Sequence, residues 1–186
     1  MTERPHDPGP TRGAARIWAA LKPPEGAPQP PARTPRDMVT DLYGITPRGA
    51  ANTAAAATAL GTSQRTIQRW IRAGLPRRSP AAERMSSSHR TWRDSTPEGR
   101  RQSMTPRQTR RLRRNGATVA FFGRIKISRD DRVRATTVAV SAARMRQIMD
   151  ATLAGDDAAA LRSLEAAFSD AFGGSVSLEV SSLELT

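Results

Sequence analysis

The chain has 186 residues, with 30 lysines and arginines against 17 aspartates and glutamates, and no cysteine. The length allows one ordinary domain or two small ones, and the net charge of +13 favours a polyanionic partner such as nucleic acid. The absence of cysteine excludes disulfides, thiolate metal sites and cysteine nucleophiles. Because no apolar run reaches the length of a bilayer crossing and no signal-peptide core is recognisable, we expect a cytoplasmic, nucleoid-associated protein without a membrane partner.

The positive charge is concentrated in the first part of the chain. Residues 1–115 carry 22 basic and 8 acidic side chains, a balance of +14, whereas residues 116–186 carry 8 basic and 9 acidic side chains, a balance of −1. The two parts are therefore expected to have different tasks.

Residues 1–35 are rich in proline, glycine, alanine and arginine, and they predict a disordered tail. Such a composition buries too little apolar surface to offset the loss of chain entropy. Within the tail, the segment IWAALK at residues 17–22 would allow a short helical turn anchored by Trp18, but a solvated turn is favoured.

Residues 36–75 have a helical pattern and predict a helix-turn-helix DNA-binding domain. Residues 53–60 are almost all small, which lets a second helix cross them closely. Gly61 is expected to make the turn, and Ser63 is a good N-cap for the next helix. The inward side of that helix is expected to consist of Ile67, Trp70 and Ile71.

The outward side of this second helix carries arginine, glutamine, serine and threonine. In the major groove arginine reads guanine and glutamine reads adenine, while hydroxyl groups contact phosphate oxygens. An ordinary helical hairpin with a solvated basic face is the alternative. The predicted DNA contacts are Arg65, Gln68, Arg69 and Arg72, followed by Ser63 and Thr66, with Arg77 and Arg78 just beyond the helix.

Residues 76–116 predict an arginine-rich basic arm or linker with little apolar content. Residues 72–114 hold 13 arginines and 3 acidic residues. Such an arm would add phosphate contacts without sequence preference, and its alternative is a solvated linker. Trp92 would either stack on an unpaired base or pack locally.

After Gly116 the pattern predicts a compact ββααβ domain over residues 117–186. Alternating apolar residues in TVAFFGRIKIS predict a strand, RDDR a turn, and VRATTVAVS the returning strand. Two amphipathic helices follow, and SVSLEVSSLEL predicts a final strand. The expected fold class is therefore α+β, with an N-terminal helix-turn-helix domain and this small C-terminal domain.

The residues indicate no catalytic centre. His6 and His89 lie far apart in segments expected to be disordered, so neither a metal site nor a catalytic triad is indicated. The pair Asp130–Asp131 offers two ligands for a divalent ion, but adjacent acids in a hairpin are more often turn formers. Composition and spacing alone thus predict a DNA-binding protein with a second domain of unknown purpose, and they indicate no intrinsic cofactor.

Three segments carry a resemblance to a known family. They are AAAATALGTSQRTIQRWIRAGLPRRSP at 54–80, DDRVRATTVAVSAARMRQIMDATLAGDDAAALRSLEAAFSDAFGG at 130–174, and SLEVSSLEL at 177–185. In order and spacing they resemble the telomere terminal proteins of linear Streptomyces plasmids and chromosomes. The N-terminal extension and the middle arm do not match closely.

The resemblance implies a protein primer, which is a substrate and not an enzyme. A DNA polymerase joins the first deoxynucleotide to a side-chain hydroxyl of such a protein, and the polymerase supplies the divalent metal ions. The implied partners are telomeric DNA, as single-stranded foldback and as duplex, a DNA polymerase and a telomere-associated protein, with self-association as a further expectation.

The acceptor hydroxyl is the point at which this sequence departs from the family. The family's linked threonine directly precedes the DD pair, and that position is Arg129 here. Ser128, one residue earlier at the expected hairpin tip, is the candidate acceptor. The fallback candidates are Thr136, Thr137 and Thr118.

Two other functions stay open. A helix-turn-helix transcriptional regulator of a plasmid would bind a duplex operator tightly and form no covalent adduct. A non-specific structural DNA-binding protein would bind with strong salt dependence and without sequence preference.

Overall fold

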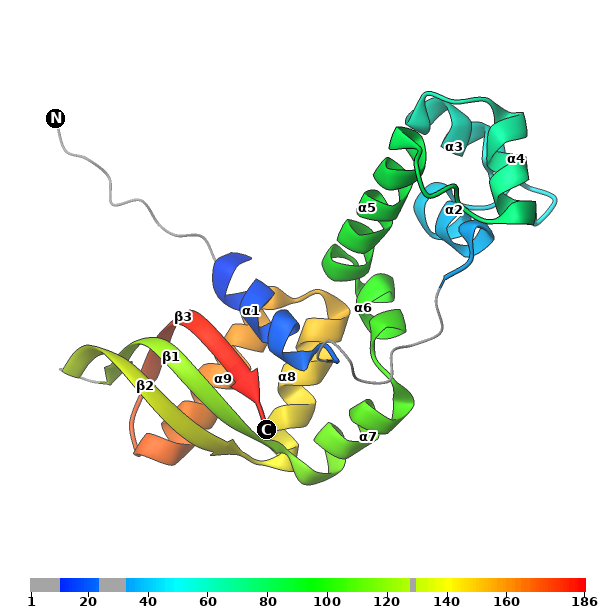
Figure 1. Ribbon diagram of the computed structural model, residues 1–186. Coiled ribbons are helices and arrows are strands. Elements are labelled where there is room, and N and C mark those ends of the chain that lie inside the picture. The colour runs from blue at the N-terminus through cyan, green and yellow to red at the C-terminus, as the bar shows by residue number, and fades with distance from the viewer. Residues whose placement is uncertain (1–10, 24–32, 128–129) are drawn as a thin grey trace, which may run out of the picture. The chain divides into compact units, whose positions relative to one another are not determined.

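A computed structural model describes residues 11–23, 33–127 and 130–186 (Figure 1). These residues form helices and a three-stranded antiparallel sheet, which confirms the α+β class. They divide into two compact units. The helical unit contains residues 33–99, and the α+β unit contains residues 11–23 together with 100–186, apart from 128 and 129.

The helical unit is built from capped helices around one small core. Its helices are α2 (Pro35–Tyr43), α3 (Thr53–Leu60), α4 (Gln64–Ala73) and α5 (Pro80–Ser95). At each start a side-chain oxygen accepts a hydrogen bond from a backbone N–H inside the helix, and these oxygens belong in order to Thr34, Asn52, Ser63 and Ser79. Such caps satisfy amide groups that have no partner inside the helix.

The close crossing of α3 and α4 follows from the small residues of α3. Ala56 and Ala57 are buried there, against Ile67 and Trp70 of α4. Gly61 joins the two helices in the left-handed region at a φ of 62°, a conformation that glycine adopts without strain. The predicted turn at Gly61 and the predicted cap at Ser63 are therefore confirmed.

The expected basic arm over residues 76–116 is wrong as a structural description. The segment folds into α5, α6 (Pro97–Ser103) and α7 (Pro106–Asn115). Met85 and His89 of α5 are buried in the helical unit, and Leu112 of α7 is buried in the α+β unit. Few apolar residues suffice because each helix needs only a narrow apolar side, with arginines covering the rest.

The α+β unit has two layers. Its elements are α1 (Thr11–Leu21), the end of α6, α7, β1 (Ala117–Ile127), β2 (Asp130–Val140), α8 (Ala142–Ala154), α9 (Asp157–Phe172) and β3 (Val176–Leu185). The sheet order β2-β1-β3 places β1 in the centre, antiparallel to both neighbours. Helices α1, α8 and α9 pack against one another on the same side of the core, and α9 contacts both β2 and β3.

Alternation along β1 separates a covered from an uncovered sheet face. Val119, Phe121 and Ile125 are buried, and the Phe121 ring meets the Phe168 ring of α9 edge-on at 5.3 Å. Phe122, on the other face, is 47% exposed. At Gly123 the register with β3 shifts, and a Cβ atom there would lie 2.1 Å from the Glu179 carbonyl oxygen.

The expectation of a disordered tail over residues 1–35 is wrong for α1. Ile17, Trp18 and Leu21 are each at most 3% exposed and belong to the core of the α+β unit. Helix α1 packs against β3 and α9, far along the chain. The rest of the expected tail, residues 1–10 and 24–32 with His6, lies outside the described residues.

Candidate nucleic-acid interface

Helix α4 buries one side and presents a polar stripe on the other. Ile67 and Trp70 are buried, while four side chains at positions i, i+3, i+4 and i+7 are exposed. This spacing places them on one side of a helix. We call them the α4 stripe: Arg65, Gln68, Arg69 and Arg72.

The start of α4 is fixed by hydroxyl and amide contacts. The Thr66 N–H donates to Oγ of Ser63 at 3.1 Å, and the two hydroxyl oxygens lie 2.9 Å apart. Nε2 of Gln64 donates to Oγ1 of Thr53 at 2.9 Å, which ties α4 to the start of α3. Ser63 and Thr66, which were expected to contact phosphate, therefore stabilise the start of α4.

The arginines of the α4 stripe keep their charge available. Among the described residues, no ion pair joins Arg65, Arg69 or Arg72 to an acidic side chain. Nε of Arg72 donates to the Gln68 carbonyl at 3.4 Å, within the helix. Arg77 and Arg78 are exposed between α4 and α5. The structure therefore places all eight predicted DNA contacts in the helical unit, six of them on α4 or its cap.

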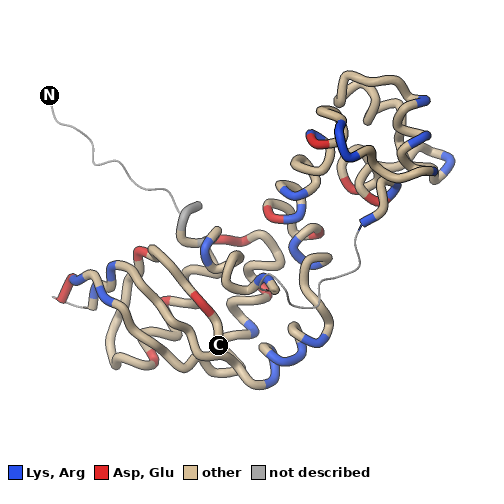
Figure 2. Tube along the Cα trace, in the orientation of Figure 1, with Lys and Arg blue, Asp and Glu red and all other residues tan. Residues whose placement is uncertain are grey.

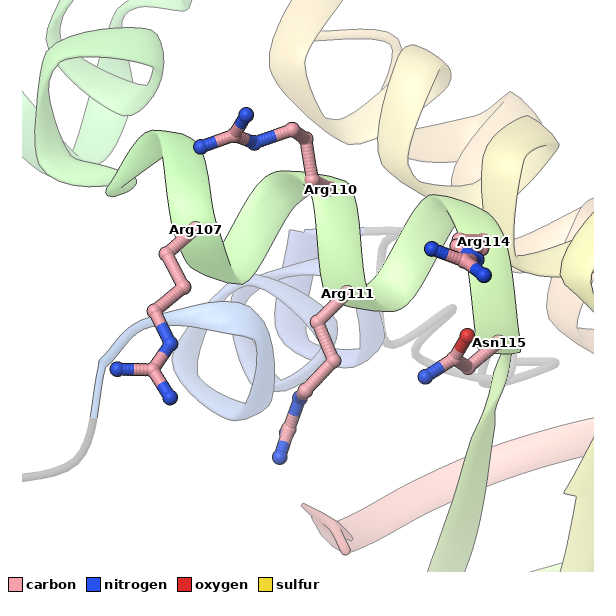
Figure 3. A pocket seen from close by; sticks show the side chains of 5 residues that line it. All are labelled: Arg107, Arg110, Arg111, Arg114 and Asn115. Atoms are coloured by element: carbon pink, nitrogen blue, oxygen red, sulfur yellow. The ribbon is translucent and has the colours of Figure 1, made fainter.

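A second group of arginines lies on α7, in the α+β unit. Arg107, Arg110, Arg111 and Arg114 are exposed and line an open hollow of about 480 Å³ with Asn115 (Figure 3). Figure 2 shows basic positions along α4 and, in the other unit, along α7. None of these four residues was predicted individually from the sequence, although their spacing after the Thr105–Pro106 helix start indicates a helix with arginines along one side.

Most other arginines of the α+β unit are paired with acids. Arg100 pairs with Asp157, Arg113 with Asp150, Arg124 with Asp131 and Glu179, Arg132 and Arg134 with Asp130, and Arg144 with Asp170. In the described part of the chain, no such pair involves the four α7 arginines. Their charge is therefore not neutralised by an acidic side chain of the described residues, whereas six other arginines of this unit have acidic partners.

The candidate acceptor hydroxyls belong to the β1–β2 hairpin. Ile127 and Asp130 are register partners, whereas Ser128 and Arg129 lie outside the described residues. Thr118 exchanges backbone hydrogen bonds with Thr186, at 3.0 and 3.1 Å. On β2, Thr136 is half-buried and Thr137 is exposed, and both line a shallow hollow of about 360 Å³.

The two acidic residues of the hairpin are engaged by arginines. Asp130 forms ion pairs with Arg132, whose Nε lies 2.6 Å from Oδ1, and with Arg134. Asp131 accepts from Nη1 of Arg124 at 3.5 Å. Over residues 11–23, 33–127 and 130–186, no cluster of three or more histidine, aspartate or glutamate side chains is placed to hold a metal ion.

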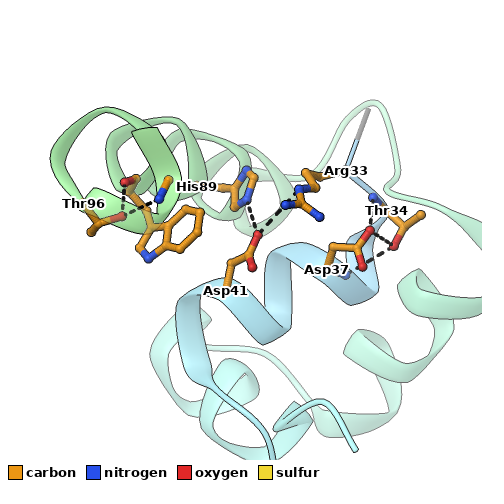
Figure 4. Close-up of polar contacts among 8 residues, drawn as sticks. Arg33, Thr34, Asp37, Asp41, His89 and Thr96 are labelled. Carbon is orange, nitrogen blue, oxygen red and sulfur yellow. Dashed lines mark hydrogen bonds and ion pairs between the residues drawn. The ribbon is translucent and has the colours of Figure 1, made fainter. Parts of the chain in front are cut away.

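His89 is part of the helical unit and not of a disordered segment, contrary to the sequence-based expectation. It is buried in α5, where its Nε2 lies 3.0 Å from Oδ2 of Asp41 (Figure 4). Its ring stacks on that of Trp92, with centroids 5.6 Å apart. Of the two alternatives for Trp92, the local packing role is therefore the one the structure supports.

Comparison with known proteins adds no family to this geometry. No protein-family model matches the chain, and no curated protein or solved structure is similar to it. Within the described ranges, none of the helices has both the length and the apolar character needed to cross a membrane.

Proposed function

We propose that this protein is a telomere terminal protein, which binds the ends of a linear DNA replicon and primes DNA synthesis there. The observation that carries DNA binding is the α4 stripe, with its exposed arginines free of acidic partners. The priming role rests on the resemblance of residues 54–80, 130–174 and 177–185 to that family. As a DNA-bound protein it would be associated with the nucleoid.

Helices α3 and α4 are proposed to act as a helix-turn-helix motif. The Gly61 turn and the buried contacts of Ile67 and Trp70 leave the α4 stripe facing outward from the helical unit. The stripe combines arginine with Gln68, so it offers donors to guanine and a bidentate partner to adenine. A mixed stripe of this kind favours base reading over simple charge attraction.

The priming step needs one hydroxyl on this chain and a polymerase as its catalyst. The hydroxyl oxygen attacks the α-phosphorus of the incoming deoxynucleoside triphosphate in line and forms a phosphodiester bond. The bond to the β-phosphate oxygen breaks, pyrophosphate leaves, and the hydroxyl proton passes to a base of the polymerase or to water. The protein is therefore consumed as a substrate, and divalent ions are bound by the polymerase.

Ser128 is the proposed acceptor because it is the nearest hydroxyl to the position where the family has its linked threonine. Thr137 is the next candidate, since it is the exposed hydroxyl among the fallback residues on β2. Thr136 and Thr118 rank below it because both are half-buried. Partners implied by the role are telomeric DNA, the polymerase, a telomere-associated protein and further copies of this chain.

DNA reading by α4 is tested with single substitutions and a matched control. Gln68→Ala and Arg69→Ala should each reduce discrimination between the replicon end and a random duplex by about 1–3 kcal/mol. Arg90→Ala removes the same charge as Arg69→Ala from an exposed site on α5, which packs against α2 and α3, and should leave that discrimination unchanged. Equal effects of all three variants would reject α4 as the reading helix.

Priming is tested by transfer of a labelled nucleotide. The chain is incubated with an α-labelled deoxynucleotide, a telomere template and the host polymerase, and label surviving denaturing electrophoresis is measured. Label on the wild type and its loss in Ser128→Ala are expected, whereas Ser177→Ala, an exposed β3 hydroxyl, should keep the label. If the label persists in Ser128→Ala but is lost in Thr137→Ala, the acceptor hydroxyl is that of Thr137 on β2.

The same two measurements separate the other functions. A transcriptional regulator would discriminate between duplex sequences through α4 and take up no label. A structural DNA-binding protein would neither discriminate nor take up label, and only its salt dependence would be pronounced.

A further inference from the structure

We propose that α7 is a second nucleic-acid surface, which binds the phosphate backbone without reading sequence and belongs to the α+β unit. Its ligand is the sugar–phosphate chain of DNA, contacted by Arg107, Arg110, Arg111 and Arg114. This surface rests on the proposed DNA binding but not on priming. It differs from the linker arm expected from the sequence because the contacts are placed on one anchored helix.

Helix α7 is anchored by its buried side. Leu112 is 1% exposed in the core of the α+β unit, and Nε2 of Gln108 donates to the Leu21 carbonyl of α1 at 2.8 Å. Arg113 pairs with Asp150 of α8, and Nη1 of Arg146 donates to the Arg113 carbonyl at 3.5 Å. The helix therefore presents its other side in a fixed direction relative to α1 and α8.

The exposed side of α7 carries four arginines, and their guanidinium groups spread out from the helix, that of Arg110 to one side and those of Arg107 and Arg111 to the other (Figure 3). The four arginines occupy positions i, i+3, i+4 and i+7, and they surround an open hollow (Figure 3). Seven residues of helix rise about 10 Å. Because one strand of a duplex carries a phosphate about every 3.4 Å along the axis, the row matches the length of about three phosphates.

The charge of this row is not neutralised locally. Residues 99–129 contain no aspartate or glutamate, so the chain around α7 supplies no counter-charge. The arginines at 100, 113, 124, 132, 134 and 144 of the same unit each have an acidic partner. A polyanion site needs arginines without acidic partners, and the four of α7 lie together on one helix.

The residues at the four positions distinguish sequence-specific contacts to bases from sequence-independent contacts to phosphates. The α4 stripe has the same i, i+3, i+4, i+7 spacing but includes Gln68, whose amide can pair with adenine. The α7 row has arginine at all four positions, and planar guanidinium groups suit the bidentate geometry of phosphate. We therefore assign sequence-specific DNA recognition to α4 and sequence-independent binding of the phosphate backbone to α7.

The test measures the salt dependence of DNA binding by the full chain. In Arg107→Gln/Arg111→Gln, the slope of log binding constant against log salt should fall by about 1.8 on a duplex and about 1.4 on a single strand. The fold loss of duplex affinity from about 50 to about 200 mM salt then shrinks about tenfold. Arg16→Gln/Arg162→Gln removes two exposed arginines of the same unit and should keep the wild-type slope.

Two further variants separate contact from folding. Arg107→Lys/Arg111→Lys keeps both charges and should restore most of the salt slope, which a folding defect would not allow. Because the chain has no cysteine, Asn115→Cys gives a single attachment point for a photo-crosslinker beside the row. Cross-linked random-sequence DNA is expected at this site, but not from the matched Arg162→Cys on α9.

The α7 surface would be rejected by a wild-type salt slope in Arg107→Gln/Arg111→Gln, or by equal slopes in this variant and its control. The four arginines would then be available to another polyanion, such as an acidic protein. The outcome is independent of priming. Label transfer with an unchanged slope rejects the α7 surface alone, and a reduced slope without label transfer rejects the primer role alone.

Discussion

Arg100 and Asp157 form an ion pair in the α+β unit, in which Nη1 of Arg100 donates to Oδ1 of Asp157 at 2.7 Å. The same nitrogen donates to the Thr152 carbonyl at 2.9 Å, and the guanidinium carbon lies 5.8 Å from the centroid of the Trp18 ring. Arg100 is only 5% exposed. The Arg100 side chain of α6 therefore contacts α8 through the Thr152 carbonyl, α9 through the Asp157 carboxylate and α1 through the Trp18 ring.

Removing Arg100 should strongly destabilise the α+β unit. Arg100→Ala leaves the buried Thr152 carbonyl and Asp157, whose side chain is 30% exposed, without their donor. Hydrogen bonds to a charged group contribute about 1.5–3 kcal/mol each to the free energy of unfolding. Arg132→Ala breaks an ion pair whose arginine side chain is 71% exposed and should cost about 0–1 kcal/mol. Urea unfolding followed by circular dichroism gives both values, and equal costs would contradict the importance of burial.

Helix α1 should be required for the stability of the α+β unit. Trp18→Ala removes a ring that is 3% exposed, so it should cost about 3–5 kcal/mol, within the range for large-to-small changes of buried aromatic residues. Arg16→Ala, two residues earlier and on the exposed side of α1, should change the free energy of unfolding by less than about 0.5 kcal/mol. Hydrogen exchange of the β1 amides reports this unit. Unchanged exchange in Trp18→Ala would mean that α1 is not part of the core.

The start of α2 should confer a pH-dependent stability on the helical unit. The Thr34 hydroxyl and then the Thr34 N–H donate to the Asp37 carboxylate, at 2.8 and 3.0 Å, and lower its pKa below the ordinary value (Figure 4). A lowered native pKa stabilises the fold above the unfolded pKa of about 3.9, and this contribution is lost as the pH falls through the native value.

Thr34→Ala should therefore cost about 1 kcal/mol at neutral pH, and part of this difference should disappear below about pH 4. Thr34→Ser keeps the hydroxyl and should follow the wild type at every pH. Thermal unfolding at a series of pH values measures the difference. If the stability difference between Thr34→Ala and the wild type instead grows as the pH falls, the Asp37 pKa does not contribute to stability in the way proposed.

The Tyr43 phenol should lose its proton at a higher pH in the native protein than in the unfolded chain. Burial raises the pKa of its phenol above the ordinary value, so the fold gains stability below the unfolded pKa of about 10 and loses it as the pH rises through the native value. Tyr43 is the one tyrosine of the chain, so tyrosinate absorbance follows this group alone. The midpoint should lie higher in native protein than in urea, and coincident midpoints would show an exposed phenol.

Local features of the helical unit could be predicted from the sequence because each depends on near neighbours. The Ser63 cap, the Gly61 turn and the buried stripe of Ile67 and Trp70 lie within ten residues of one another. The same holds for the alternating pattern of β1. The outward direction of the α4 stripe then follows from the period of the helix.

Other features depended on partners far along the chain. Arg100 looks like one more charge of a basic segment until Asp157, 57 residues later, is brought beside it. Trp18 lies in a proline-rich stretch whose composition predicted disorder, and only the packing of α1 within the α+β unit buries it.

The sequence by itself determined an α+β protein with an excess of arginine and a capped helix with an exposed side of arginine and glutamine, for which DNA contact is a prediction. Only the tertiary structure decided which arginines are neutralised and which stay open, as on α7. The physical reason is that periodicity and capping act between residues close in the chain, whereas burial and charge pairing are set by what the folded chain brings together.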